Sequence, residues 1–277
     1  MAFVTKHSFL GKNSSQVVLT TLFFCALSPQ ASNASPWPQP HKRFLLISRT
    51  DYFNADLGKI NTINGLVEGR FQKTSADLYL EYGLTQKITL GGKIIYSQNW
   101  LSRGNNVERA NGFSEIEIFG QYNLLQTTRG SGSVKVAITK PSDFQSGQRP
   151  GLQSRGYDVT ASVLYGHNIS TDPVKIFATI ETGFKKRFSD SSDQIEGQAT
   201  LGIEPSDKWL FLLDTFATKS LKNEKLAGAD FDIVKVQPSI VWRPNKRWSL
   251  QAGVTQEIAG RNLSLGRTFF FSLWSAF

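Results

Sequence analysis

The chain has 277 residues, of which 40% are hydrophobic and 19% are charged, and its formal net charge is +9. Its mean hydropathy of −0.24 suits a soluble domain or a β-barrel membrane protein, which spreads its apolar residues singly. It argues against a helical membrane protein, which needs several long apolar runs. The basic residues do not gather in one run, so the charge gives no support for nucleic-acid binding.

One apolar run lies near the start of the chain. Lys6 and Lys12 precede the run Val17–Leu27, and small residues follow at Ser32 and Ala34. A basic region, about a dozen apolar residues and then small residues are the layout of a secretory signal. We therefore predict a signal peptide in residues 1–34. An uncleaved anchor helix is the alternative, and the run is short for it.

The sole cysteine, Cys25, lies inside the predicted signal. A lipoprotein interpretation is disfavoured because Phe23 and Phe24 stand where a small residue belongs. Without Cys25 the mature chain has no thiol, and so neither disulfides nor a thiolate metal site. Residues 35–42 are rich in proline and predict an extended periplasmic leader, which lies either in the periplasm or in the mouth of a barrel.

Apolar and polar residues alternate from residue 43 to the end, in segments that turn residues separate. Side chains two residues apart share a face of a strand, so the pattern predicts strands with one apolar face. There are twelve such segments, and an even number of strands places both ends of the chain on one side of the membrane. The segments are 43–53, 74–83, 87–97, 113–124, 133–140, 156–167, 174–185, 194–203, 208–218, 231–242, 247–258 and Arg267–Phe277.

The connections between these segments alternate in length, as periplasmic turns and outer loops do. Two segments fit the pattern poorly. The facing of 208–218 is uncertain because Leu210 and Leu212 are apolar like their neighbours, and Pro238 predicts a bulge within 231–242. The short connections are 83–86, 125–132, 168–173, 204–207 and 243–246, and the longer ones are 54–73, 98–112, 141–155 and 219–230.

The last strand ends on an aromatic ring. Phe269, Phe271, Leu273, Ser275 and Phe277 share one face of it. A terminal Phe after alternating aromatics resembles the assembly signal of Gram-negative outer-membrane β-barrels. The resemblance implies an all-β, transmembrane, antiparallel up-and-down barrel over residues 43–277, located in the cell outer membrane. It also implies contacts with outer-membrane lipid and with the barrel-assembly machinery.

Aromatic residues on the apolar face gather near the two ends of the predicted strands, as the two girdles of a membrane barrel do. A soluble two-sheet sandwich has no reason to sort its rings in this way. One girdle comprises Tyr82, Tyr122, Tyr165, Trp209, Trp242 and Trp248, and the other comprises Tyr52, Tyr96, Tyr157 and Phe184.

The opposite face of the strands carries charges that cannot stay bare in a dry interior. Either water fills the lumen and rings of charge select a solute, or the charges pair across a closed barrel; we favour the channel. The predicted lumen-lining residues are Asp77, Glu81, Lys93, Glu115, Glu117, Lys135, Asp158, Lys175, Glu181, Glu196, Lys235 and Glu257, with Lys185 and Arg49 on the same face.

The predicted loops carry basic residues, which we expect to contact lipopolysaccharide phosphates; attraction of anionic solutes is the alternative. These residues are Arg70, Arg103, Arg109, Arg149, Arg155, Lys222, Lys225 and Arg261.

Catalysis is not expected. His41 and His167 are the only histidines of the mature chain, and Ser162 lies five residues before His167, so the two face opposite sides of a strand. No Gly-rich phosphate loop or His-rich metal spacing is present, so we expect neither a cofactor nor a bound metal.

The segment Leu78–Gly92 resembles hairpins of small outer-membrane proteins, including a transporter family named after phenol degradation. The resemblance covers one hairpin and implies passive uptake or export of a small molecule. The sequence therefore predicts a narrow channel or passive transporter for a small polar or charged solute. The alternative is a closed structural barrel that acts through its surface loops, in adhesion, biofilm formation or exopolysaccharide handling.

Overall fold

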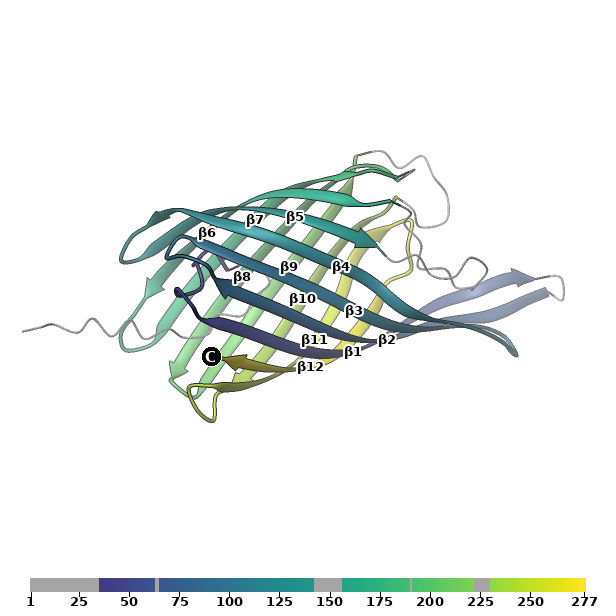
Figure 1. Ribbon diagram of the computed structural model, residues 1–277. Coiled ribbons are helices and arrows are strands. Elements are labelled where there is room, and N and C mark those ends of the chain that lie inside the picture. Colours follow the sequence, from purple (N-terminus) through teal and green to yellow (C-terminus); the bar gives the residue numbers. More distant parts are fainter. Residues whose placement is uncertain (1–34, 63–64, 142–155, 190, 222–229) are drawn as a thin grey trace, which may run out of the picture.

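The computed structural model describes residues 35–277 except 63–64, 142–155, 190 and 222–229. These residues form one closed antiparallel barrel in which each strand pairs with its neighbours in sequence (Figure 1). The predicted all-β, twelve-strand, up-and-down barrel is confirmed. The described residues include no helix that is long and apolar enough to cross a membrane.

The strand bounds follow the predicted segments most closely in the second half of the chain. The strands are β1 (Phe44–Thr62), β2 (Gly65–Gly83), β3 (Ile88–Arg103), β4 (Asn106–Gln126), β5 (Gly130–Pro141), β6 (Asp158–Ser170), β7 (Lys175–Arg187), β8 (Gln194–Ser206), β9 (Trp209–Ser220), β10 (Asp232–Trp242), β11 (Trp248–Arg261) and β12 (Gly266–Ala276).

The last strand closes the barrel. β12 lies between β11 and β1 and pairs with both. The N–H of Phe277 donates to the carbonyl oxygen of Phe44 (3.0 Å), and the N–H of Phe44 donates back (3.2 Å). The guanidinium carbon of Arg247 lies 4.5 Å from the centre of the Phe277 ring. Neither sheet edge is therefore left unpaired, which hydrocarbon surroundings require. We call this end of the barrel the terminal end and the opposite one the loop end.

Side chains alternate across the wall as the sequence predicts. On β6, Val163 and Tyr165 are exposed on the outer surface, whereas Ser162 and Leu164 are buried in the interior. Large apolar side chains cover the outer surface on every strand, far beyond the apolar patches of soluble monomers. Such a surface fits a hydrocarbon environment, because burial of apolar area against lipid replaces burial in a core.

Two predicted loops were wrong. Residues 54–73 are largely strand, because β1 continues to Thr62 and β2 begins at Gly65; residues 98–112 likewise belong to β3 and β4. The backbone hydrogen bonds between the strands continue where the apolar alternation stops. A strand that extends beyond the membrane still pairs its backbone groups but needs no apolar face. Gly104, at a φ of 56°, makes the tight turn of the second hairpin. Figure 1 shows both hairpins standing out beyond the other strands.

Two uncertain positions are settled by the pairing. Leu210 and Leu212 point inward and are buried, so Trp209 lies on the outer surface. The bulge predicted at Pro238 is absent: β10 and β11 stay in step on both sides of that residue, and the register shift lies between Val234 and Lys235. Pro238 costs only the ladder bond that its missing N–H removes.

The interior near the terminal end is packed with apolar side chains. Leu45, Phe177, Leu210, Val241 and their neighbours form one buried cluster inside the barrel there. A glycine in the wall makes room for the largest ring: a Cβ atom on Gly202 would lie 2.1 Å from Cζ of Phe177. A twelve-strand bore lies between the small barrels that side chains fill and the wide porins, so this cluster narrows the bore at that end.

We expect Gly202→Ala to lower the free energy of unfolding by about 1–3 kcal/mol, because the added methyl group overpacks the Phe177 ring. Urea unfolding of the protein in lipid vesicles measures the change. Gly197→Ala in the same strand is the matched control, since its Cβ atom would meet nothing nearer than 3.9 Å. Equal stabilities of the two variants would show that the cluster is not tightly packed.

Candidate functional site

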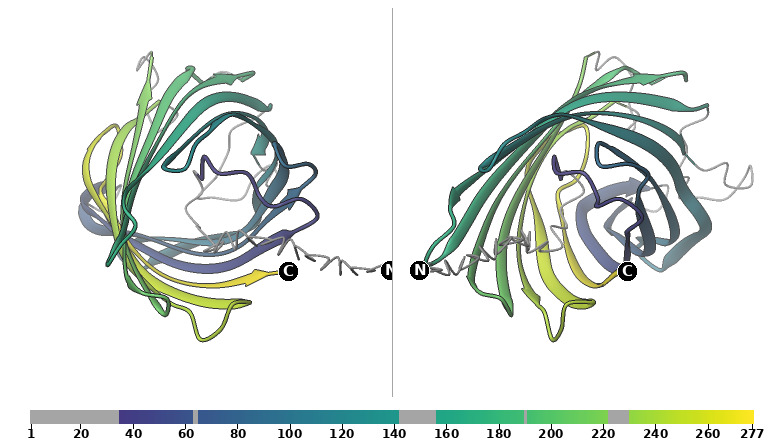
Figure 2. Two further views of the ribbon diagram at one scale, coloured as in Figure 1. Left: turned by 90° about the vertical axis from the view of Figure 1, so that its left-hand side faces the viewer. Right: turned by 60° about the vertical axis from the view of Figure 1, so that its left-hand side comes forward.

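The proline-rich segment before β1 lies inside the barrel. Figure 2 shows the chain before β1 turning into the bore from the terminal end. The carbonyl oxygen of Pro36 accepts hydrogen bonds from Oγ of Ser131 (2.8 Å) and Oγ of Ser133 (2.6 Å), and from Nδ2 of Asn123 (3.3 Å). Three wall side chains thus converge on one backbone carbonyl. We call residues 35–40 the inner segment.

The wall is shaped to receive this segment. Trp37 contacts Phe177 edge to face, with ring centres 6.4 Å apart. Gly166 of β6 leaves the space that Trp37 occupies: a Cβ atom there would lie 2.5 Å from Cγ of Pro36 and from Cη2 of Trp37. The inner segment therefore continues the apolar cluster of the terminal end and shares in closing the bore.

A carboxylate fastens the other end of the inner segment. Glu81 accepts hydrogen bonds from Nε2 of Gln39 and from Oη of Tyr79 (2.5 Å for the latter). The backbone N–H of Gln39 also donates to Oγ1 of Thr89 (2.9 Å). The two positions foreseen for residues 35–42 are thus resolved in favour of the barrel mouth, while the boundary at Ala34 stays a prediction because residues 1–34 lie outside the described part.

A cavity occupies the bore between the inner segment and the loop end. Its volume is about 900 Å³, and Phe53, Leu57 and Phe71 line it towards the loop end while Ile47 and Trp274 form its floor. A second cavity of about 250 Å³ adjoins it, because both are lined by Tyr79 and Lys93. The terminal end of the interior thus holds the apolar cluster, the inner segment and the buried Arg243–Glu204 ion pair, and the two cavities lie towards the loop end.

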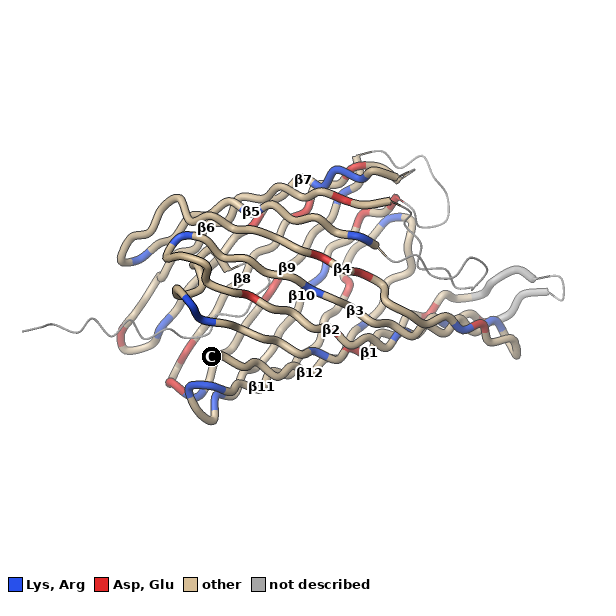
Figure 3. Tube along the Cα trace, viewed as in Figure 1, with Lys and Arg blue, Asp and Glu red and all other residues tan. Residues whose placement is uncertain are grey.

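The predicted lumen-lining residues take different positions in this bore, and Figure 3 shows charges spread through the wall. Glu81 binds the inner segment, Glu115 pairs with Lys93, Asp158 lies at the loop end and Lys175 lies at the terminal end, 3.7 Å from Asp207. The residues that line the two cavities are Asp77, Lys93, Glu117, Lys135, Glu181, Glu196, Lys235 and Glu257.

Most of these charges are paired within the wall. The lumen thus combines the two outcomes that the sequence allows, since a hollow space and ion pairs occur together. The nitrogen–oxygen distances are 2.8 Å for Arg49–Asp51, 2.6 Å for Lys93–Glu115, 2.7 Å for Lys135–Glu181, 2.5 Å for Lys185–Glu196 and 3.3 Å for Lys235–Glu257.

Sequence reasoning missed three charged residues of the larger cavity: Asp51, Lys73 and Asp214. Lys73 fell in the stretch assigned to a loop, although it shares a face with Asp77 four residues on. Asp214 follows Leu212 on the strand of uncertain facing. Asp51 lies two residues after Arg49 and therefore shares its face of the strand. The alternation thus indicated that Asp51 faces the lumen, but this was not used.

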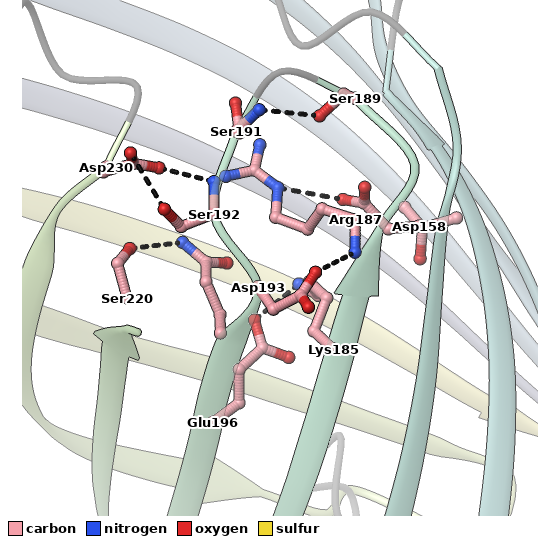
Figure 4. Close-up of polar contacts among 12 residues, drawn as sticks. Asp158, Lys185, Arg187, Ser189, Ser191, Ser192, Asp193, Glu196, Ser220 and Asp230 are labelled. Carbon is pink, nitrogen blue, oxygen red and sulfur yellow. Dashed lines mark hydrogen bonds and ion pairs between the residues drawn. The ribbon is translucent and has the colours of Figure 1, made fainter. Parts of the chain in front are cut away.

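Further charges tie down the loop end. Arg187 lies 3.7 Å from Asp158, and Asp193 accepts from the N–H of Arg187 (3.0 Å) and from Nζ of Lys186 (2.8 Å), as Figure 4 shows in part. Those two hydrogen bonds, the backbone one first, lower the pKa of the Asp193 carboxyl. Buried Asp230 accepts from the N–H of Ser192 (2.7 Å). Ser192 and Asp193, just before β8, are thereby held to Asp230 and to the end of β7.

The predicted girdle residues Tyr52, Tyr122, Tyr157, Tyr165, Trp209 and Trp242 are exposed on the outer surface, and Tyr82, Tyr96 and Trp248 are half-buried. His167 is exposed, whereas Ser162 is buried in the interior. Among the described residues, no group of three or more His, Cys, Asp or Glu side chains is arranged to hold a metal ion.

No family model and no curated protein matches the sequence. Solved structures do match. An outer membrane channel from Pseudomonas putida F1 has a TM-score of 0.67 and 11% identity, over 90% of this chain and 100% of that one. The NanC porin has a TM-score of 0.52 and 8% identity, over 82% and 98%. The KdgM porin in complex with disordered oligogalacturonate has 0.50 and 8%, over 83% and 99%.

At these identities the likeness concerns the fold alone. The fold is that of outer-membrane channels and porins. The chain therefore has a closed twelve-strand β-barrel fold like that of those proteins, and its own inner segment lies in the bore at one end.

We expect the inner segment to be shielded from solvent reagents. The mature chain offers a clean probe because it lacks cysteine, and Ser35 is buried. A maleimide should label Ser35→Cys slowly, and about tenfold faster when Ser131→Ala and Ser133→Ala remove two hydrogen bonds to Pro36. Ser97→Ala, which is buried elsewhere in the wall and bonded to Ser114, should leave the rate unchanged. Fast labelling without any wall substitution contradicts the assignment.

Proposed function

We propose that the protein is an outer-membrane channel for passive passage of a small polar or charged solute, and that the inner segment is its gate. The observation that carries the proposal is the division of the bore. A charged cavity of about 900 Å³ lies above a terminal end that the segment and the apolar cluster fill. Outer-membrane barrels have their longer loops outside the cell, so we place the loop end towards the exterior and the terminal end towards the periplasm.

The way in which the inner segment is attached supports a gating role. It precedes β1 and takes part in no strand ladder, so it can leave the bore without opening the barrel. Its contacts with the wall are one hydrogen bond at Ser35, three at Pro36, two at Gln39 and one aromatic contact at Trp37. Each hydrogen bond between neutral groups contributes only about 0.5–1.5 kcal/mol net, so a solute that competes for the same wall groups can displace the uncharged segment.

The charges of the bore support a preference for cations over anions. Acidic side chains outnumber basic ones along the two cavities, and charged rings set the sign of the ion that a narrow pore admits. The acidic residues there are Asp51, Asp77, Glu117, Glu181, Glu196, Asp214 and Glu257, and the basic ones are Arg49, Lys73, Lys93, Lys135 and Lys235.

The remaining expectations on surroundings stay proposals. Location in the outer membrane, insertion by the assembly machinery with Phe277 as signal, and contact with lipopolysaccharide agree with the apolar outer surface. Of the basic residues expected to meet lipopolysaccharide, Arg103 lies 3.6 Å from Glu108 and Arg261 lies 3.3 Å from Asp232. Arg149, Arg155, Lys222 and Lys225 lie outside the described residues. We propose no catalysis, cofactor or nucleic-acid binding.

A second candidate is a closed barrel that acts through its outer surface. It draws on the long β1–β2 and β3–β4 hairpins, which have 19, 19, 16 and 21 residues per strand. Because about 9–11 residues cross a membrane, these strands project well beyond it. Adhesion, biofilm or exopolysaccharide handling would need this projecting sheet and no conductance.

Planar-bilayer recordings test the gate. We expect small conductance from the mature protein and several-fold larger conductance when residues 35–40 are deleted, because the bore then loses its filling at the terminal end. Gly166→Ala should act in the same direction, since its methyl group displaces Trp37. Gly197→Ala is the matched control. If deletion leaves the barrel folded and equally silent, the channel proposal fails and the surface role is favoured.

Reversal potentials in a salt gradient test selectivity. We expect the protein without residues 35–40 to prefer potassium to chloride. Glu117→Gln should weaken that preference and Lys135→Met should strengthen it, because both residues line the smaller cavity and carry opposite charges. A preference for chloride, or one that neither substitution moves, would show that these side chains do not set the field in the pore.

A further inference from the structure

Two opposite charges in the larger cavity have no hydrogen-bond or ion-pair partner among the described residues. Lys73 and Asp77 both line it, from the same strand, β2. Among the described residues, neither forms a hydrogen bond or an ion pair, and Oδ1 of Asp77 is completely buried. A buried charged oxygen without a donor is costly, so native structures supply it with water or a ligand.

The other charged residues of this cavity make the contrast plain, because each is satisfied by a neighbour. Asp51 accepts from Arg49, Glu196 from Lys185 and Glu257 from Lys235. Lys93 pairs with Glu115, and Asp214 accepts from Thr200 and Gln237. Among the charged residues that line this cavity, Lys73 and Asp77 therefore stand apart.

The spacing of the two residues sets the shape of what they can bind. They are four residues apart on one face, so their Cα atoms are about 13 Å apart at the usual rise of a strand. Their charged ends do not approach within the 4.0 Å of an ion pair. A solute that carries both charges fits between them, its carboxylate at Lys73 and its ammonium at Asp77.

Apolar surface lies beside the pair. Phe53 and Phe71, whose ring centres are 6.0 Å apart, line the same cavity together with Phe216. Pockets for small molecules combine such a wall with a few placed polar groups. We propose that this site binds a small zwitterion, with one ammonium, one carboxylate and a compact apolar part. The inference names the solute of the proposed channel and rests on that function for its role in transport.

Leucine is the probe, and two molecules that each lack one of its charges are the controls. Titration calorimetry on the mature protein in nanodiscs should show leucine binding, and binding at least tenfold weaker for 4-methylpentanoate, which lacks the amine, and for 3-methylbutylamine, which lacks the carboxylate. Glycine, which lacks the apolar part, should also bind more weakly than leucine. Equal affinities for all four would overturn the proposal.

Variants assign the charges. Lys73→Met should weaken leucine and 4-methylpentanoate but leave 3-methylbutylamine unchanged, and Asp77→Asn should do the reverse. The exchange variant with Lys73→Asp and Asp77→Lys should bind leucine with its ammonium at residue 73 and its carboxylate at residue 77. The paired control is Lys175→Met with Asp207→Asn, an ion pair at the terminal end outside both cavities, which should leave leucine binding unchanged. Loss of all ligands in every variant, or no loss in either single variant, contradicts the site.

Binding is measured at equilibrium and needs no conductance, so the two proposals fail separately. Leucine binding without conductance in the segment-deleted protein would overturn the channel and keep the site. Conductance without leucine binding would keep the channel and overturn the site. Where both hold, leucine should enter liposomes that contain the segment-deleted protein faster than 4-methylpentanoate does.

Discussion

The pairing of β12 with β1 is the constraint on which the rest of the structure depends. Hydrocarbon supplies no hydrogen-bond partner, so a sheet within it has to satisfy both of its edges with one another. Once Phe277 and Phe44 exchange their backbone bonds, the parity of every strand is fixed. A side chain then has only two destinations, lipid or bore. This explains why a chain with negative mean hydropathy shows so many large apolar side chains outside and so many charges inside.

Closure also creates the interior that the chain must then fill or wet. Near the terminal end the solution is packing, with Leu45, Phe177, Val241 and Trp274 meeting across the bore. Towards the loop end the inward side chains become charged, and a cavity opens between them. Charges tolerate water and apolar side chains exclude it, so the order of residues along each strand sets where the bore is sealed. The seal and the solute space are two regions of one alternating pattern.

The sequence predicts well which side of the wall a residue faces and poorly which residue it contacts, for a physical reason. Period-two alternation reports which side of the wall a residue faces, and it placed twelve strands and most lumen charges. It carries no information on strand ends outside the membrane, which is why β1 and β2 were cut short and Lys73 was lost. Nor does it reveal that Lys135 on β5 reaches Glu181 on β7. That contact passes over β6, where Ser162, the residue paired with Lys135, has a small side chain.

The position of the inner segment follows from what proline lacks. Pro36, Pro38 and Pro40 have no N–H, so proline at every second residue leaves one edge of the segment without donors and keeps it from pairing with a strand on each side. Its carbonyl groups remain, and they need donors. The wall provides them from side chains, three of which converge on Pro36. A segment held by wall side chains, and excluded from the ladder, occupies the bore without becoming part of the barrel. The composition that prevents a thirteenth strand is therefore the same one that makes the segment removable.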